Sequence, residues 1–217
     1  AGSPPINDLL PTPIRLDRLL RWLLLYPNRK AALALYQGFS KGFRIPALGI
    51  PPNPHCKNQV SVKGHREVII KKLRKEHELG RIAGPFPFPP LQDFVCSPLG
   101  LVSRKEPGQF RLIHNLSAPR GQSVNDGIDP QLCSVRYASV DLAVATLRQL
   151  GPGALLAKAD IESAFRLLPV HPEDHHLLGF HFEGGYYYDK CLPMGYSVAC
   201  AYFEQSPGVD FHPGFWF

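Results

Sequence analysis

Hydrophobic residues near the start of the chain recur with the period of a helix. In residues 14–25 the leucines stand at i, i+3, i+4, i+7 and i+8 and so share one side of a helix; they are Leu16, Leu19, Leu20, Leu23 and Leu24. Pro13 stands where helices often begin, and Asp17 and Arg21 face away from the leucines. A second, shorter helix is predicted over residues 29–36, ended by Gly38. The pattern predicts a helical arm.

Residues 61–79 combine a helical apolar period with many basic side chains. The apolar side consists of Val62, Ile69, Ile70, Leu73 and Leu79, and the basic residues are Lys63, Arg66, Lys71, Lys72, Arg74 and Lys75. Gly80 is a typical helix end. The basic face either contacts phosphate groups or is the solvated face of an ordinary helix. For a charge run taken alone, the solvated face is the more common case.

From Asp93 onward the pattern changes to strand-forming runs. Residues 94–103 and 109–116 flank Glu106-Pro107-Gly108, and Pro followed by Gly fits the centre of a type II turn, so we predict a hairpin. The remaining predicted elements are a helix over 139–150 capped by Ser139, a short apolar strand over 154–160, a hairpin of strands 177–182 and 186–189, and a helix over 197–205.

Composition adds a basic charge and many prolines. The chain of 217 residues has a net charge of +6 and a pI near 9.1. A basic surface attracts polyanions such as nucleic acid, although charge alone is weak evidence. The 23 prolines cluster at 4–13, 46–54 and 85–90, which we interpret as linkers or extended arms around folded pieces.

The cysteines and the apolar runs exclude other classes of protein. The five cysteines are widely spaced and form no Cys-x-x-Cys pair, which argues against a disulfide scaffold and a zinc finger and suits a reducing compartment. No apolar run is long enough to span a bilayer. We therefore expect an intracellular protein, cytoplasmic or nuclear, without a membrane partner.

Asp160 is the first candidate for chemistry, because it ends a predicted strand that is apolar apart from Lys158. A carboxylate at the end of a buried strand can hold a divalent cation at the edge of a cleft. An Asp in such a position is more often a helix cap or a turn residue. The residue by itself leaves both interpretations open.

The order of three motifs resembles the reverse transcriptase family. Residues 158–165, Lys-Ala-Asp-Ile-Glu-Ser-Ala-Phe, resemble motif A of that family, and residues 192–197, Leu-Pro-Met-Gly-Tyr-Ser, resemble motif B. Residues 110–117 followed by 123–126 resemble the fingers motif. The sequences of these motifs are most similar to those of DIRS-type retroelements. The stretch 12–45 is also similar to the segment that precedes the polymerase in these elements. The resemblance covers most of the chain, and three motifs in the right order are a strong signal.

The resemblance implies a role for each residue that matches motif A. Asp160 would bind Mg²⁺ together with the main-chain carbonyl of Ile161, as one of two aspartates that hold two metal ions for nucleotidyl transfer. Ala164 and Phe165 would bind the nucleotide, with the Phe165 ring under the sugar of the incoming dNTP, where it excludes a 2′-hydroxyl. The alternative is that Phe165 is a plain core residue.

The other two motifs would complete the nucleotide site. Arg111 would hold the triphosphate, because a guanidinium can hydrogen-bond to two phosphate oxygens at once, and Arg104 and Lys105 would assist. Met194 would contact the nucleotide or the template, and Gly195 would let the backbone approach the nucleotide without a Cβ in the way. The alternatives are ordinary hairpin charge for the basic residues and a simple turn for Pro-Met-Gly.

Two further groups are weaker candidates. Three histidines stand close to two acids, in the set His171, Glu173, Asp174, His175 and His176. Adjacent side chains project in different directions and the spacing is not that of a zinc finger, so we predict a polar loop. The tyrosines 186–188 would form a stacking platform for bases, but in a strand at least one of them faces the opposite side, toward the core.

The sequence also departs from the family. The second carboxylate motif, Tyr-x-Asp-Asp, does not occur among the 22 residues after Gly195, where Pro and Gly break the expected helix and Asp210 stands alone. We expect a chain that is inactive by itself: a reverse transcriptase domain cut short, a nucleic-acid-binding module without catalysis, or a decayed retroelement product. We also expect an exposed sheet edge beside 154–160.

The predicted fold class is α+β, a right-hand polymerase fragment with fingers and a partial palm after an N-terminal helical arm. The predicted division is an arm and Pro-rich linker over 1–57, a fingers-like region over 58–153, a partial palm over 154–205 and a divergent tail over 206–217. The expected partners are an RNA or DNA template–primer, dNTPs and other retroelement modules, with Mg²⁺ as the cofactor.

Overall fold

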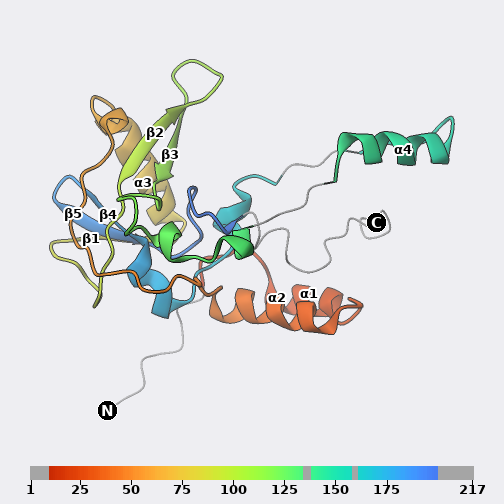
Figure 1. Cartoon of the computed structure of the whole chain (residues 1–217), viewed down its shortest axis with the longest axis horizontal. Helices are drawn as coiled ribbons and strands as arrows, with labels where there is room; N and C mark the ends of the chain where they lie inside the picture. Colours follow the sequence, from red (N-terminus) through yellow and green to blue (C-terminus); the bar gives the residue numbers. More distant parts are fainter. Residues whose placement is uncertain (1–9, 134–137, 158–160, 200–217) are drawn as a thin grey trace, which may run out of the picture.

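The chain folds into a body of helices and small sheets from which two helical segments extend (Figure 1). The structure is a computed structural model and describes residues 10–133, 138–157 and 161–199. The fold is α+β, as predicted. Its helices are α1 Leu16–Leu23, α2 Arg29–Lys41, α3 Arg66–Glu78 and α4 Val140–Leu150; its strands are β1 Ile82–Phe86, β2 Leu99–Ser103, β3 Phe110–His114, β4 Gly179–Phe182 and β5 Gly185–Asp189. Its 3₁₀ helices are η1 Val60–Val62, η2 Val124–Gly127, η3 Pro130–Cys133, η4 Ala164–Leu167 and η5 Pro172–Leu178.

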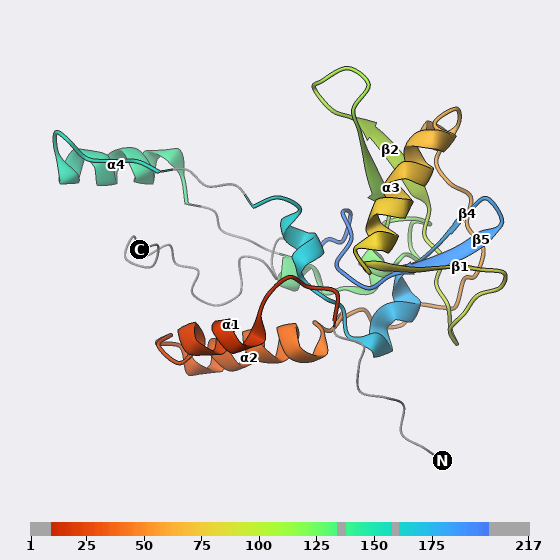
Figure 2. The same cartoon turned by 180° about the vertical axis from the view of Figure 1, so that it is seen from behind.

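The N-terminal arm is a hairpin in which α1 and α2 lie side by side (Figures 1 and 2). Leu23 of α1 and Ala31 and Ala32 of α2 are buried. Asn28 caps α2, because its Oδ1 accepts a hydrogen bond of 3.1 Å from the Ala31 N–H. The apolar period of residues 14–25 thus correctly predicted a helix, although Leu20 and Leu24 of its leucine side are exposed.

The prediction that Gly38 ends the second helix is wrong, because α2 continues to Lys41. Gly38 is a packing residue: a Cβ added there would lie 2.3 Å from the ring of Phe43. The helix ends instead at Gly42, whose φ of +96° suits glycine.

Strands β1, β5 and β4 form an antiparallel sheet in that order. The predicted β4–β5 hairpin is confirmed, although β4 starts later than expected because η5 occupies residues 172–178. Strand β1 was not predicted, since Pro85 lies within a segment that we interpreted as a proline-rich arm. β1 is an edge strand with a register shift between Ala83 and Phe86, where a residue without an N–H is tolerated.

Strands β2 and β3 form a separate antiparallel ribbon, which confirms the predicted hairpin. Gly108 has a φ of +76°, as the predicted turn requires. Both strands are shorter than expected, because residues 94–98 make only isolated bridges to other segments. Helix α3 packs against this ribbon and the sheet through a buried cluster: Ile69, Leu73, Ile82, Leu99, Leu101, Phe180 and Phe182.

Helix α4 forms where it was predicted, but it extends away from the body (Figure 1). The Ser139 Oγ accepts a hydrogen bond of 3.1 Å from the Leu142 N–H and caps the helix. None of its residues is buried, although its sequence has an apolar side.

The strand predicted over 154–160 is wrong for residues 154–157, which are not in a strand and expose 96% of Leu155 and 74% of Leu156. A strand needs a neighbour for its backbone hydrogen bonds, and no described strand lies beside this segment. Residues 158–160, and the predicted helix 197–205 beyond residue 199, lie outside the described residues.

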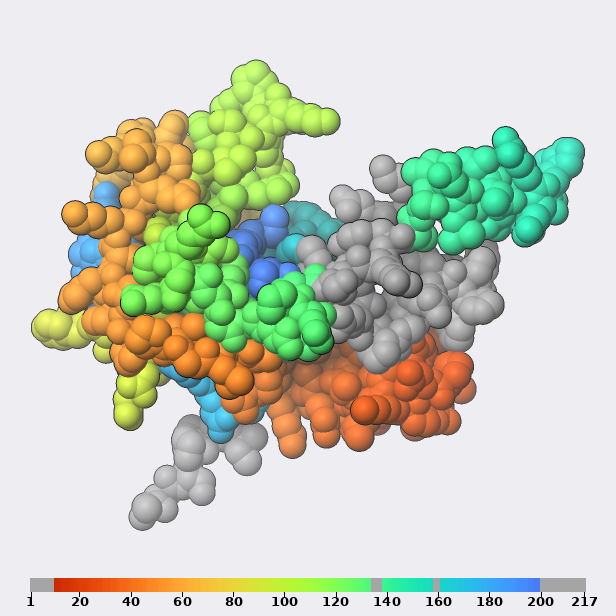
Figure 3. All heavy atoms as spheres, in the orientation of Figure 1, coloured from red at the N-terminus to blue at the C-terminus, as the bar shows by residue number. Residues whose placement is uncertain are grey.

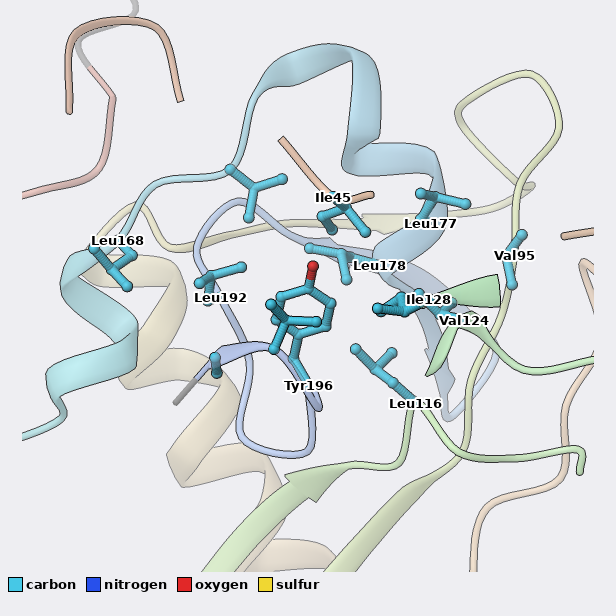
Figure 4. Packing of buried hydrophobic residues seen from close by; sticks show 13 residues of the cluster. Ile45, Val95, Leu116, Val124, Ile128, Leu168, Leu177, Leu178, Leu192 and Tyr196 are labelled. Carbon is cyan, nitrogen blue, oxygen red and sulfur yellow. The ribbon is translucent and has the colours of Figure 1, made fainter. Parts of the chain in front are cut away.

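The larger hydrophobic core gathers side chains from distant segments around Tyr196 (Figure 4). Its other members are Ile45, Val95, Leu116, Val124, Ile128, Leu168, Val170, Leu177, Leu178, Leu192, Val198 and Ala199. The proline-rich stretch 46–54 contributes to it, because Ala47 and Ile50 pack against the cluster. Within the described ranges, no helix is long and apolar enough to cross a membrane.

Candidate nucleotide site

The residues predicted to bind a nucleotide come from β3, from the turn at Gly195 and from η4. The turn lies directly against β3: the His114 N–H donates a hydrogen bond of 3.3 Å to the Met194 carbonyl. A Cβ added to Gly195 would lie 2.3 Å from the His114 carbonyl oxygen, and the φ of this residue is +117°. Both space and backbone conformation therefore require glycine here. The turn and its packing on β3 fit the simple-turn alternative, and contact of Gly195 with a nucleotide stays a prediction.

Arg111 lies on the same side of β3 as the contact with Gly195. The Cβ position of Gly195 is 3.5 Å from Cγ2 of Ile113, and residues two apart on a strand share a face. Arg111 therefore lies about 7 Å along the strand from Ile113, on the face that meets the turn. Its side chain is exposed and forms no ion pair with any carboxylate in the described part of the chain. The cation is available to an anionic ligand.

Asn125 fastens the turn, a role that we did not predict. Its Nδ2 donates hydrogen bonds of 2.9 Å to the Gly195 carbonyl and 2.8 Å to Ser117 Oγ, and its Oδ1 accepts one of 3.1 Å from the Ser197 N–H. Its own N–H donates to the Leu116 carbonyl at 2.9 Å. One amide thus ties the segment after β3 to the backbone of Gly195 and Ser197. The sequence shows Asn125 within the fingers-like motif, but it does not show which residues this side chain contacts.

Of the residues matching motif A, the structure describes those from Ile161 onward. The side chain of Ile161 is 45% exposed, Ala164 is half-buried, and Phe165 packs against the larger core. The packing of Phe165 favours the alternative of a core residue, and its role under a sugar stays a prediction. Asp160 lies outside the described residues.

Arg166 is the centre of a buried network that sequence reasoning missed. Its Nη1 lies 2.6 Å from Asp189 Oδ1, and its Nη2 lies 2.7 Å from Glu76 Oε2. The other oxygen of Asp189 is 2.9 Å from His114 Nδ1, while His114 Nε2 is 2.9 Å from the Gly179 carbonyl. The network joins η4 to α3, β5 and β3. It therefore fixes His114, whose backbone holds the Gly195 turn.

The charges in this network support one another. Burial alone would raise the pKa of Asp189, but the Arg166 charge and the His114 hydrogen bond outweigh it and hold that pKa below its usual range. Burial likewise opposes the charge of Arg166, but Asp189 and Glu76 hold its pKa above the ordinary value. The buried carboxylate and guanidinium are therefore both charged at neutral pH.

Basic side chains of α3 lie near Arg104, which follows β2. Burial, followed by repulsion from Arg104 and Lys75, lowers the pKa of Lys72 on α3. Helix α3 also exposes Lys71 and Arg74. The α3 surface is thus close enough to the ribbon for their cations to repel each other, and an anion between them would relieve this repulsion.

The His/Asp/Glu group at 171–176 is structural, in agreement with the predicted polar segment, although it forms η5 rather than a loop. Asp174 is buried and binds Arg44 at 2.8 Å and the Ile45 N–H at 2.7 Å. Burial lowers the pKa of His175, whose Nε2 is 3.0 Å from the Val170 carbonyl. Within the described ranges, no group of three or more His, Cys, Asp or Glu side chains is arranged to hold a metal.

The tyrosines of β5 are all half-buried. Tyr187 stacks on Phe180 with ring centroids 5.2 Å apart and packs against the buried cluster between α3 and the sheet. This confirms that at least one of the three belongs to the core. It leaves Tyr186 and Tyr188 on the other side of the strand.

Two cysteines far apart in sequence meet in the structure. The Sγ atoms of Cys56 and Cys96 are 2.7 Å apart, Cys96 being fully buried. The hydrogen bond from Cys96 lowers the pKa of Cys56, whereas the hydrogen bond to Cys56 and burial raise the pKa of Cys96. Spacing along the sequence gave no sign of this pair.

Comparison with known proteins supplies a structural relative. No family model matches the chain, and no curated protein matches its sequence. Among solved structures, it is similar to the foamy viral protease-reverse transcriptase in complex with an RNA/DNA hybrid, with a TM-score of 0.50 and 13% identity over 94% of this chain and 27% of that one. The foamy viral protease-reverse transcriptase dRH in complex with double-stranded DNA gives a TM-score of 0.49 and 15% identity over 94% and 36%.

The chain thus spans about a quarter of the length of the foamy viral protein bound to the hybrid. At such identity the similarity concerns the fold alone. The chain has a reverse-transcriptase-like fold.

Proposed function

We propose that this chain is the fingers and part of the palm of an RNA-directed DNA polymerase, and that it contributes the triphosphate-binding side of the nucleotide site. The observation that carries the proposal is the contact between Gly195 and β3, where only glycine fits and the exposed Arg111 lies on the adjoining face. Asn125 and the Arg166 network hold this arrangement in place. The sequences of the motifs support a DIRS-type retroelement as the origin of the parent enzyme.

A metal ion would be held by residues that match motif A. Mg²⁺ would bind at the Asp160 carboxylate and the Ile161 carbonyl and would stabilise the charge that develops on phosphoryl transfer. A two-metal site needs a second carboxylate, which Asp160 by itself does not supply. We propose that the chain by itself binds a dNTP and a template–primer but does not extend the primer.

The test is equilibrium binding of a fluorescently labelled dNTP to the purified chain. A charge-assisted hydrogen bond is worth about 1.5–3 kcal/mol, so Arg111→Ala should weaken binding by about tenfold or more. Arg148→Ala is the matched control, because Arg148 is an exposed arginine on α4, away from the body. Equal affinity of the Arg111→Ala variant and the wild type would refute the proposed site.

A primer-extension assay on an RNA template tests the expected lack of activity. The purified chain should add no nucleotide. Incorporation that Asp160→Ala abolishes would overturn this expectation and would make the chain a complete catalyst.

The alternative, a nucleic-acid-binding module without a nucleotide site, is favoured by the absence of a strand at 154–157. It predicts salt-dependent binding of an RNA–DNA hybrid with no measurable dNTP affinity. In that case Arg111→Ala would change hybrid binding by no more than the loss of one surface charge.

A further inference from the structure

The helical arm carries a surface that the proposed nucleotide site does not use. Residues 10–42 contain six basic side chains and one acidic side chain, a net charge of +5 in a chain whose total is +6. The basic residues are Arg15, Arg18, Arg21, Arg29, Lys30 and Lys41, and the acid is Asp17. In Figure 3 the arm forms a lobe at one side of the body. This lobe is a second concentration of positive charge, separate from that of α3.

One side of α1 exposes an aromatic ring among arginines. Trp22 of α1 is 59% exposed, and Leu25, in the turn after α1, is 67% exposed, whereas Leu23 is buried. Together with Arg18 and Arg21 they line an open depression of about 420 Å³. Arg18 and Trp22 are spaced i, i+4 and so share one face of α1, and Leu25 lies in the turn that follows the helix.

The two arginines beside the ring are available to a ligand. In the described ranges, neither Arg18 nor Arg21 forms an ion pair, whereas Arg15 binds Asp17 at 3.1 Å and Arg29 donates to the Leu24 carbonyl at 2.6 Å. An exposed indole flanked by unpaired guanidinium groups combines a flat surface for a base with donors for its phosphates.

We propose that this surface of α1 binds single-stranded nucleic acid, with Trp22 stacking on a base and Arg18 and Arg21 contacting the adjacent phosphates. Charge complementarity selects a polyanion, and the exposed ring selects unpaired bases, since bases within a duplex already stack on one another. A membrane surface fits less well. Helices that lie in a bilayer separate their apolar and basic faces, whereas here the arginines and the apolar residues line the same depression.

The arm is fixed to the body next to the candidate nucleotide site. The Thr12 hydroxyl donates to the Leu167 carbonyl at 2.8 Å, and the Phe43 N–H donates to the Pro169 carbonyl at 2.7 Å. Both anchors adjoin η4, which carries Phe165. A strand held by the arm is therefore kept at a set position relative to η4. The binding surface itself does not depend on Arg111 or Gly195.

The primary test is fluorescence anisotropy of labelled oligo(dT) and oligo(U) with the full chain. Trp22→Ala should weaken binding about tenfold, because stacking of one base is worth about 1–3 kcal/mol, and Trp22→Phe should restore most of it. Arg18→Ala and Arg21→Ala should each reduce the slope of log K against log salt by about 0.7. Phe88→Ala, which removes a ring that is 76% exposed elsewhere, should have no effect. Thermal melts would verify that all variants fold.

A second readout identifies the occupant. The chain has two tryptophans, so Trp216→Phe leaves Trp22 as the only one, and stacking on a base should quench its emission. Quenching by oligonucleotide that is competed by unlabelled oligo(U) supports the proposal. No quenching, combined with a blue shift on vesicles of phosphatidylcholine and phosphatidylserine, would overturn it in favour of a membrane. No quenching, combined with dimerisation that Trp22→Ala abolishes, would overturn it in favour of a second copy of the chain.

Discussion

Replacing Arg166 by Met should strongly destabilise the fold, because it leaves the buried carboxylate of Asp189 without its cation. The Arg166 side chain is 10% exposed and that of Asp189 is 6% exposed, and their contact is 2.6 Å. Removing one partner of a buried ion pair costs about 3–5 kcal/mol, a large fraction of the roughly 5–15 kcal/mol that stabilises a typical domain. For a chain of this size, the melting temperature should fall on the order of 10 °C.

The matched control is Arg66→Met. Arg66 also bridges two carboxylates, those of Glu67 and Glu183, but its side chain is 60% exposed. Exposed pairs contribute about 0–1 kcal/mol, so this variant should unfold close to the wild-type urea concentration. Urea unfolding followed by circular dichroism measures both variants. If Arg166→Met costs no more than Arg66→Met, the buried network does not stabilise the fold and the reasoning fails.

The pH dependence gives the network a second test. The pKa of Asp189 is lowered in the folded chain, so its stabilisation is complete above the ordinary carboxyl pKa of about 3.9 and is lost as pH falls through the lower folded value. Without Arg166, burial dominates and raises the pKa of Asp189, so protonation in acid relieves the variant. The difference in unfolding free energy between wild type and Arg166→Met should be largest at neutral pH and should shrink as pH falls from the raised pKa of Asp189 in the variant to its lowered pKa in the wild type. A constant difference from pH 7 to pH 3 would contradict this assignment.

Three further predictions concern other contacts. Glutathione disulfide should oxidise the Cys56 and Cys96 thiols to a disulfide and release two glutathiones, which peptide mapping would detect; a persistently reduced pair would contradict the 2.7 Å contact. Asn125→Ala removes three side-chain hydrogen bonds at the Gly195 turn and should cost about 1–3 kcal/mol in urea unfolding; no change would mean that the turn is held by His114 alone. Brief trypsin or chymotrypsin treatment should cut first in or beside 154–157, where the leucines are exposed and no strand forms, and initial cleavage within the sheet would be inconsistent with this.

Local signals predicted the elements whose structure depends on neighbouring residues. The leucine period located α1, the Pro-Gly pair located the turn between β2 and β3, and Ser139 located the start of α4. In each case the cause lies within a few residues of the effect.

Contacts between distant residues were missed for the opposite reason. Glu76 and Asp189 meet Arg166 across 90 and 23 residues, and Cys56 meets Cys96 across 40. Neither the hydrophobic period nor the spacing of residues along the chain indicates such contacts. Strand β1 was missed because a proline argues against a strand unless the strand is known to lie at an edge, which only the assembled sheet reveals.

The strand order β1-β5-β4 also has a consequence for self-association. Proline and a register shift interrupt β1 at one edge, and at the other edge the N–H and C=O of Gly179 are taken by Val95 and Ser97. Neither edge offers a long row of free backbone groups to a strand from another copy, so this sheet is a poor template for fibril growth. The most exposed large apolar side chain of the described residues, Leu155, lies instead outside the sheet, next to the exposed Leu156. Efforts to keep the chain monodisperse at high concentration should begin with these two leucines and leave the sheet untouched.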